Sequence, residues 1–310
     1  MTSGTPDAEI MVARAQMSET RRPTVAALEA ILQIEHRVLD HGFVRVIDYM
    51  GDDGAIVQAA RVSYGRGTKK VSEDRALIRY LMRHWHSTPF EMCEIKLHVK
   101  LPIFVARQWV RHRTANINEY SARYSILDRE FYTPSREHLA AQTTINRQGR
   151  GAVLEEEQAA RVLHLLREDA ERSYATYRQL LNDPDDPDHD ADRTGLAREL
   201  ARIGLGLSTY TQWYWKTDLH NLFGFLRLRA DPHAQFEIRI YAELIRDIVR
   251  QWVPVSCEAF EDYRMNAVSL SAAEADVVRK VLAGTTLSRP QNISTREWSE
   301  FATRFGIIGA

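Results

Sequence analysis

The segment between residues 94 and 125 constrains the fold more than any other part of the chain. Residues 94–100 alternate polar and apolar side chains, which is typical of a strand buried on one face only. Pro102 then suits the first turn of a helix, and residues 103–110 carry apolar positions at helical spacing. The sequence therefore predicts a strand that leads directly into a helix, and so a fold that mixes α and β elements.

Charged and polar side chains cluster where this helix should end. Gln108 and Arg111 are three residues apart and share a helix face. Farther along, Glu119, Ser121 and Arg123 alternate, which places them on one side of an extended chain. Arginine forks and serine hydroxyls bind phosphate or carboxylate groups. The spacing is compatible with an anion site, and it is equally compatible with a solvated helix end that carries ordinary ion pairs.

Four ordered sequence blocks decide between these readings, because together they resemble the flavin-dependent thymidylate synthases. Arg111-His112-Arg113, seven further residues and Ser121 match the RHR-x7-S signature of that family. The other blocks are His86-Ser-Thr88-Pro-Phe-Glu91, Phe104-Val-Ala-Arg-Gln108-Trp before the signature, and Leu228-Arg229-Ala-Asp-x-His-Ala-Gln-x-Glu-Ile238. The resemblance covers about residues 40 to 262.

The resemblance implies a reaction and a set of ligands. A member of this family makes dTMP from dUMP by reductive methylation. It takes the carbon from 5,10-methylenetetrahydrofolate, releases tetrahydrofolate, and takes the hydride from FAD that NADPH has reduced. Such enzymes are α/β (α+β) proteins with a central sheet of few strands, flanked by long helices, and one catalytic domain assembles into a homotetramer with shared active sites. The flavin carries the hydride chemistry, so the protein must position ligands and manage charge.

Site residues follow from the same resemblance. It places dUMP against the side chains of Gln108, Arg111, Glu119, Tyr120, Ser121, Ala122, Arg123, Arg202 and Arg229. Ser121 and Arg123 are expected to hold the phosphate. Arg229 is the expected catalytic residue, because a guanidinium beside the uracil would stabilise an anion at N3 and make C5 a better nucleophile. An alternative role for Arg229 is an ion pair with Asp231 or Glu237.

The FAD site is expected at Thr88, Arg111, His112, Arg113 and Glu119, together with His86, Ser63 and His220. Many family members carry Asn-x-Arg where this chain has Asp218 and His220, and a polar residue where it has Gly224. A carboxylate cannot donate a hydrogen bond to a flavin carbonyl as an asparagine amide can. Side-chain contacts to flavin at positions 218 and 224 are therefore not expected, whereas His220 remains a possible donor. No metal site is expected, and the acidic stretch 183–190 is interpreted as a solvated, proline-broken turn.

Three parts are predicted along the chain: an N-terminal extension with one helix (1–39), the catalytic domain (40–265) and a less patterned C-terminal extension (266–310). Periodicity predicts strands at 43–50 and 94–100 and helices at 24–39, 55–63, 74–85, 103–110, 153–181 and 194–207. A further helix is expected from an N-cap at Asp231 to about Trp252. In the helix at 74–85, Trp85 is expected to belong to the core stripe.

The amino-acid composition limits the classes of function that this chain can have. With 41 basic and 42 acidic residues, the chain has no global field suited to nucleic acid, although a local basic patch at 107–123 leaves a nucleotide- or RNA-binding module as an alternative. A flavoprotein with another acceptor is a second alternative. The two cysteines, Cys93 and Cys257, fit a reducing cytoplasm better than a disulfide framework, and Cys93 is expected to be a buried apolar residue. No apolar run is long enough for a membrane span.

Overall fold

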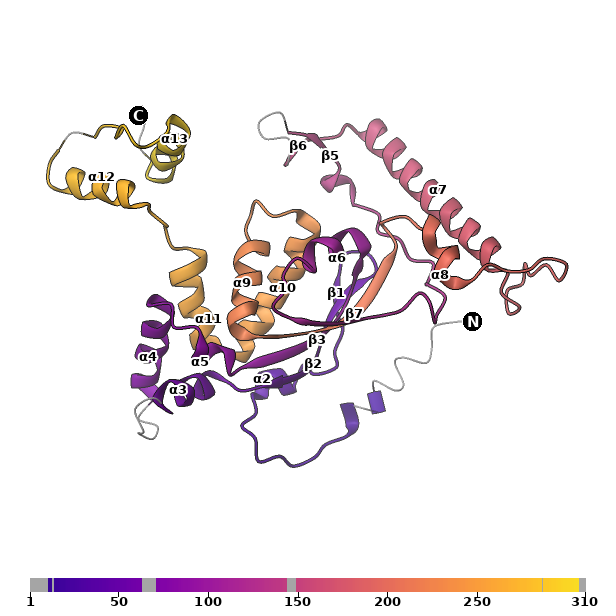
Figure 1. Cartoon of the computed structure of the whole chain (residues 1–310), viewed down its shortest axis with the longest axis horizontal. Coiled ribbons are helices and arrows are strands. Elements are labelled where there is room, and N and C mark those ends of the chain that lie inside the picture. Colours follow the sequence, from indigo (N-terminus) through magenta and orange to yellow (C-terminus); the bar gives the residue numbers. More distant parts are fainter. Residues whose placement is uncertain (1–10, 13, 63–70, 144–148, 286, 307–310) are drawn as a thin grey trace. The chain divides into compact units, whose positions relative to one another are not determined.

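The computed structural model describes residues 11–306 apart from 13, 63–70, 144–148 and 286 (Figure 1). Ser63 lies outside the described residues. Contacts divide the chain into two compact units, Met1–Met265 and Asn266–Ala310. Each unit is described by itself below. Among the described residues, no helix is both long enough and apolar enough to cross a membrane.

A five-stranded antiparallel sheet forms the centre of the larger unit, with the strand order β1-β2-β3-β7-β4. The strands are β1 (His36–Val38), β2 (Gly42–Met50), β3 (Glu94–Pro102), β7 (Tyr210–Asp218) and β4 (Asn116–Glu119). Residues 95, 97, 99 and 101 of β3 are buried, whereas the intervening side chains are half-buried. The predicted strands at 43–50 and 94–100 and the one-sided burial of the second are thus confirmed.

No sequence prediction covered β7, although it pairs with both β3 and β4. Its sequence YTQWYWKTD is rich in β-forming aromatic residues and threonine, and Trp213 and Trp215 are buried on one face. The alternation was therefore present in the sequence as a signal for a strand.

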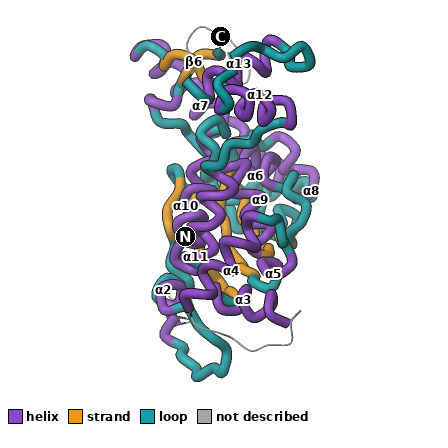
Figure 2. Tube along the Cα trace, turned by 90° about the vertical axis from the view of Figure 1, so that its left-hand side faces the viewer, coloured by secondary structure: helices purple, strands orange, loops and turns teal. Residues whose placement is uncertain are grey.

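Three helices cover the apolar face of the sheet: α6 (Ile103–Trp109), α9 (Leu219–Arg229) and α10 (Phe236–Trp252). Figure 2 shows the strands lying among these helices. Trp109 of α6 is fully buried, and its ring lies 4.6 Å from Phe225 of α9 and 6.0 Å from Tyr241 of α10, measured between ring centroids. Aromatic packing of this kind buries a large apolar area and fixes where α6 ends. We call this apolar centre the large core.

Further helices extend the large core at one end of the sheet. They are α2 (Ala26–Glu29), α3 (Asp53–Val62), α4 (Val71–Arg83), α5 (Thr88–Glu91), α11 (Pro254–Phe260) and the π-helical turn η3 (Glu261–Met265). The predicted helix at 24–39 is wrong, because only a single turn forms before the chain enters β1. Trp85 is also not in the core. It follows the end of α4 with a φ of 62° and is 66% exposed.

A second, smaller apolar cluster lies under the long helix α7 (Glu156–Leu181). We call it the small core, and its buried members are Ala122, Leu127, Tyr177, Leu181 and Ala201. The short helix α8 (Arg198–Ala201) and the 3₁₀ turn η2 (Arg202–Gly204) pack against α7. The expected helix at 194–207 is therefore wrong in length. The 3₁₀ turn η1 (Arg136–His138) and the hairpin of β5 (Ala140–Gln142) and β6 (Arg150–Val153) precede α7.

The C-terminal unit has a pattern of its own, contrary to the expectation of a weakly patterned extension. Its helices are α12 (Ala272–Leu282) and α13 (Thr295–Arg304). Each begins with a capping box, in which Ser271 or Ser294 exchanges hydrogen bonds with the glutamate three residues later. Val277, Ile293, Trp298 and Phe301 form its apolar cluster.

Candidate functional site

The arginine at the end of α9 meets the histidine that follows α6. Arg229 is the last residue of α9, and its Nε donates a hydrogen bond to Nε2 of His112 over 2.9 Å. Burial, and then the nearby charges of Arg229 and Arg111, lower the pKa of His112 to about 4. The imidazole is therefore neutral near pH 7, accepts through Nε2 and carries its proton on Nδ1. A neutral partner leaves the charge of Arg229 available to a ligand.

The alternative ion pairs for Arg229 do not form. Asp231 accepts hydrogen bonds from the backbone and ring nitrogens of His233, and Glu237 is held by other partners described below. Asp231 is also not the N-cap of α10, since that helix begins five residues later at Phe236. Burial, and then repulsion from Arg111, lower the pKa of Arg229. This end of the large core thus holds concentrated positive charge, which suits an anionic ligand.

Other predicted residues surround this point. Gln108 is half-buried on the last turn of α6 and donates its amide hydrogen to Oε1 of Gln235. Arg111 and Arg113 are exposed, and no carboxylate among the described residues pairs with either. Gln108, Arg111, His112, Arg113 and Arg229 are called the helix-end group below. Glu119 lies nearby in sequence on β4, where its carboxylate accepts a 2.7 Å hydrogen bond from Thr211 on β7.

The expected phosphate residues lie on a tight turn and not on an extended segment. The carbonyl oxygen of Ser121 accepts hydrogen bonds from the backbone nitrogens of Tyr124 and Ser125, and its Oγ accepts one from the backbone nitrogen of Arg123. The expectation that residues 119, 121 and 123 share one side of a strand is wrong, because β4 ends at Glu119. The side chain of Arg123 forms a 3.1 Å ion pair with Glu199 of α8.

Ser121, Ala122, Arg123 and Arg202 are called the turn group below. Ala122 is buried in the small core, and Tyr120 packs against the same cluster while its hydroxyl donates to the carbonyl oxygen of Ile126. Arg202 is exposed at the start of η2. Among the described residues, no hydrogen bond or ion pair joins the turn group to the helix-end group. Sequence neighbours thus rest on two separate cores.

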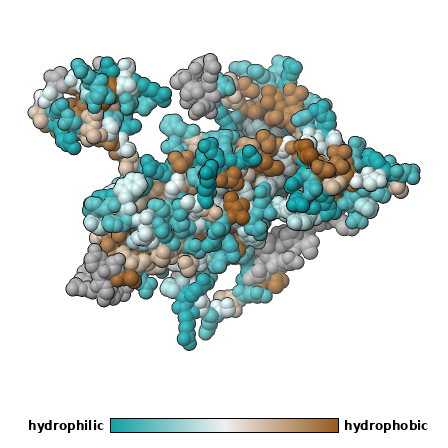
Figure 3. All heavy atoms as spheres, in the orientation of Figure 1, coloured by the Kyte–Doolittle hydropathy of each residue, from teal (hydrophilic) through white to brown (hydrophobic). Residues whose placement is uncertain are grey.

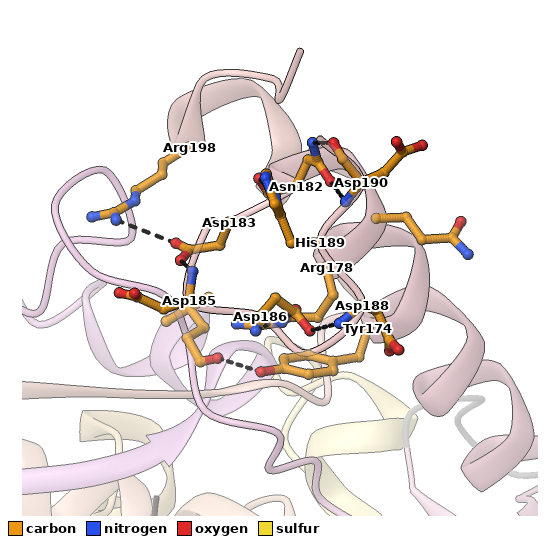
Figure 4. Close-up of polar contacts among 12 residues, drawn as sticks. Tyr174, Arg178, Asn182, Asp183, Asp185, Asp186, Asp188, His189, Asp190 and Arg198 are labelled. Atoms are coloured by element: carbon orange, nitrogen blue, oxygen red, sulfur yellow. Dashed lines mark hydrogen bonds and ion pairs between the residues drawn. The ribbon is translucent and has the colours of Figure 1, made fainter. Parts of the chain in front are cut away.

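The acidic turn after α7 braces this region (Figure 4). Asn182 adopts a left-handed conformation with a φ of 45°, and its side chain bonds to the backbone of Asp190 and Arg193. Asp186 pairs with Arg178 of α7. Arg198 of α8 pairs with Asp183 over 3.7 Å and donates to the carbonyl oxygen of Tyr124. Asp183 therefore links the acidic turn to α8, and Arg198 links α8 to the backbone just after the turn group.

Residues expected to contact FAD line two further cavities. One, of about 250 Å³, lies beside α9 and is called the α9 cavity. Its lining includes the rings of Trp85, Phe90 and Phe223 and the polar groups of His220, Arg227 and Arg264. His86 lines this cavity and also a second one, of about 480 Å³, to which Thr88 belongs. His86 stacks on Tyr80 with ring centroids 5.8 Å apart.

The residues that depart from the family pattern have structural explanations. Asp218 caps α9, since its carboxylate accepts hydrogen bonds from the backbone and side-chain nitrogens of Asn221. A Cβ added at Gly224 would meet nothing within 4 Å, so this glycine leaves space in the α9 cavity. Arg264, whose guanidinium lies 3.1 Å from the ring centroid of Trp85, was not expected in a site. The sequence offered one signal for this contact, namely Trp85, which lies just beyond the end of α4.

Neither cysteine is suited to nucleophilic chemistry. Cys93 and Cys257 are free and fully buried, and burial raises the pKa of each thiol to about 12. The expectation that Cys93 is a buried apolar residue is confirmed, although it lies just before β3 and not within it. Since the thiolate is the reactive form, both groups are inert near neutral pH.

The fold and the arginine-rich helix end define an anion-binding protein with a small antiparallel sheet. Residues 45–255 match the family model Thy1, described as thymidylate synthase complementing protein. The chain is 62% identical over 296 residues to the flavin-dependent thymidylate synthase of Gluconobacter oxydans (strain 621H), covering 95% of each protein. It is 61% identical over 300 residues to that of Ruegeria pomeroyi (strain ATCC 700808 / DSM 15171 / DSS-3), covering 96% of this chain and 97% of the relative.

A solved structure shares the fold. The UMP/dUMP methylase PolB from Streptomyces cacaoi, bound with 5-Br UMP, superposes with a TM-score of 0.64 and 32% sequence identity. The match covers 75% of this chain and 98% of that one. The chain belongs to the family of flavin-dependent thymidylate synthases. This confirms the family and mixed α/β fold expected from the sequence, and with them a methyltransferase that converts dUMP to dTMP. The binding-module and other-flavoprotein alternatives are thereby set aside.

Proposed function

We propose that this enzyme methylates dUMP with carbon from 5,10-methylenetetrahydrofolate and with a hydride from FAD that NADPH has reduced, releasing tetrahydrofolate. The observation that carries the proposal is the helix-end group. It offers three arginines, a neutral histidine and no pairing carboxylate among the described residues, and the two thiols elsewhere in the large core are inert. Such a site can bind and orient anionic ligands, and it offers no cysteine for attack on the uracil ring.

The residues around α9 fit a flavin. The α9 cavity combines aromatic side chains with the donors of His220, Arg227 and Arg264, and Gly224 leaves room for a ring system. Thr88 and His86 lie at the neighbouring cavity, and we assign Arg111, His112, Arg113 and Glu119 to the flavin as well. Bound FAD would supply the hydride. The role of the protein is then to exclude water from the ring and to hold its carbonyl oxygens with the arginine and histidine donors among these residues.

For the nucleotide, we assign Gln108, Arg111, Glu119, Arg202 and Arg229 to dUMP, together with the turn group and Tyr120. Arg229 would lie against the uracil, where its charge stabilises the electron density that builds up as C5 attacks carbon. Ser121 and Arg123 would hold the phosphate. Arg123 must then exchange Glu199 for the phosphate, and this exchange has a small cost because both side chains are more than half exposed.

We further propose a homotetramer in the cytoplasm, with residues 40–265 as the catalytic domain and with active sites shared between chains. The two groups of dUMP residues rest on separate cores and share no hydrogen bond among the described residues. Exposed apolar residues also occur on the elements of the small core, namely Leu165, Leu166, Leu200, Ile203 and Leu207. Apolar patches over α7 and α8 are visible in Figure 3. Such patches are typical of subunit interfaces. Two buried free thiols agree with a reducing compartment.

Complementation tests the shared site. At a dUMP concentration well below the dissociation constant of the Arg123→Ala enzyme, Arg229→Ala chains and Arg123→Ala chains are each expected to form little dTMP on their own in the NADPH-dependent assay. Co-expressed with different affinity tags and purified as hybrids, they should regain activity, because one site then receives Arg229 from one chain and Arg123 from the other. Hybrids that stay inactive while binding FAD would show that each site lies within a single chain. The visible absorbance of the purified protein and omission of each substrate in turn test the flavin, NADPH and folate.

A further inference from the structure

A buried carboxylate lies behind Gln108. Glu237 in the first turn of α10 is 3% exposed. Its Oε1 accepts a 3.0 Å hydrogen bond from the hydroxyl of Tyr132 and another from Arg150, and its Oε2 accepts a 2.9 Å hydrogen bond from the amide nitrogen of Gln235. Burial by itself would raise the pKa of Glu237, but the hydrogen bonds from Gln235, the backbone and Arg150 outweigh it and the pKa is lowered. Glu237 is therefore ionised at neutral pH.

The ionised carboxylate fixes the direction of a hydrogen-bond chain. A carboxylate only accepts, so the NH2 group of Gln235 must face Glu237 and its carbonyl oxygen must face away. That oxygen can only accept in turn, and the amide nitrogen of Gln108 donates to it. The amide of Gln108 is thereby oriented, and its own carbonyl oxygen remains for a ligand. Because the carboxylate can only accept, the direction of these hydrogen bonds does not depend on which amide atom is assigned as nitrogen.

We propose that Glu237 and Gln235 are positioning residues that make Gln108 present a hydrogen-bond acceptor to the nucleotide. The inference rests on the proposed function, which places Gln108 at dUMP. It predicts that the nucleotide donates a hydrogen bond to the carbonyl oxygen of Gln108, either from the N3–H of the uracil or from the 3′-hydroxyl of the sugar. If Glu237 did not hold Gln235, the Gln108 amide would be free to rotate and to present its NH2 group to the same donor.

A double-mutant cycle on dUMP affinity, measured by calorimetry on the flavin-bound enzyme, tests the coupling. Glu237→Gln keeps the shape but lets residue 237 donate as well as accept, so the direction of the chain is lost. The affinity for dUMP should fall about 2- to 12-fold, which corresponds to the free energy of one neutral hydrogen bond. In a Gln108→Ala background, the same change should add nothing. An equal loss in both backgrounds would mean that Glu237 acts only through the fold, and would overturn the proposal.

Two further variants protect the test against misfolding. Gln235→Met breaks the chain while leaving Tyr132 and Arg150 on Glu237, and it should reproduce the weakened dUMP binding. Asp53→Asn is the matched control, since Asp53 is a half-buried carboxylate that accepts hydrogen bonds from Val255 and Ser256, away from Gln108. It should lower thermal stability and leave dUMP affinity unchanged. Normal dUMP affinity in a folded Gln235→Met enzyme would contradict the relay.

Analogues identify the donor on the ligand. If N3–H donates to Gln108, the affinity for N3-methyl-dUMP should no longer depend on Glu237. If the 3′-hydroxyl donates, the affinity for the 3′-deoxy analogue should no longer depend on Glu237. A dependence that survives both changes excludes both donors and overturns the proposal. Unchanged dUMP affinity in Gln108→Ala would instead remove Gln108 from the nucleotide site, which is a failure of the proposed function. A loss in Gln108→Ala without any loss in Glu237→Gln is a failure of the relay alone.

Discussion

The helix-end group and the turn group lie within about fifteen residues of sequence on either side of β4, apart from Arg229 and Arg202, yet they are built differently. The helix-end group rests on the large core, where tryptophans from α6 and β7 are fully buried. Arg229 and Gln108 of this group bond to His112 and Gln235, which are both neutral. The turn group rests on the small core, and Arg123 is paired with a carboxylate. The rigidly supported and uncompensated charge of the helix-end group suits the methyl-transfer chemistry. The exchangeable ion pair of the turn group suits the binding of a phosphate.

Arg229→Ala should break the helix-end group with the largest effect. FAD should stay bound, whereas methyl transfer should fall about 10²–10³-fold because one preorganised electrostatic partner is lost. Arg229→Lys should rescue poorly, since an ammonium cannot reproduce the planar guanidinium. The measurement is single-turnover oxidation of the reduced, dUMP-bound enzyme by methylenetetrahydrofolate. Near wild-type rates with both ligands bound would reduce Arg229 to a partner of His112 and remove the contrast between the two groups.

Arg123→Ala should affect affinity and not chemistry. A charged hydrogen bond contributes about 1.5–3 kcal/mol, so dUMP should bind at least about tenfold more weakly, and deoxyuridine, which lacks the phosphate, should bind as before. The wild-type enzyme should prefer dUMP over deoxyuridine by a similar factor. Glu199→Gln is the matched control: it releases Arg123 from its ion pair and should not weaken dUMP binding. Equal affinity of the wild type for dUMP and deoxyuridine in calorimetry would remove Ser121 and Arg123 from the phosphate site.

Acid should destabilise the larger unit. His98 bonds to Arg45 and Gln212 on neighbouring strands, and burial, followed by the charge of Arg45, lowers its pKa to about 4. The pKa of His112 is lowered to about 4 as well. Between that value and the unfolded value of about 6.5, the unfolded chain binds more protons, so stability is lost as the pH falls through this window.

The expected loss of unfolding free energy is at most about 2 kcal/mol for each histidine, and less for His112, because solvent screens its half-exposed ring. Urea unfolding followed by tryptophan fluorescence at pH 7 and pH 4.5 measures it, since Trp109, Trp213, Trp215 and Trp252 all belong to the large core. His98→Gln keeps an acceptor and a donor in place and should make the pH dependence shallower. The same slope in this variant would show that other groups carry the acid sensitivity.

The smallest effect is expected for the cysteines. A Cys93→Ala, Cys257→Ala enzyme that folds and binds FAD should keep its turnover, because neither thiol is exposed or ionised at neutral pH. Stability should fall by about 1 kcal/mol, as is usual for a buried deletion. NADPH-dependent dTMP formation is the assay. Abolished turnover in the intact variant would place the chemistry near a thiol and away from the helix-end group.

The sequence by itself determined the periodic elements and the family. Alternation in β3 and the apolar stripe of α10 predicted what they bury, because burial on one face leaves a repeat of two or of about 3.6 residues. The family blocks predicted a methyltransferase acting on dUMP. Periodicity could not reveal that Ser121 to Ser125 form a turn, since local hydrogen bonds among three or four residues leave no repeat.

Only the tertiary structure decided how distant side chains meet. His112 and Arg229 are 117 residues apart, and the chain Gln108–Gln235–Glu237 joins α6 to α10. These contacts depend on how β3 and β7 pair and on where Trp109 packs against Phe225, which no single segment encodes. Asp218 shows the same limit, because comparison with the family suggested a lost ligand and the structure shows a helix cap. Local sequence specifies which face is buried, whereas packing between elements specifies which polar groups remain for a ligand.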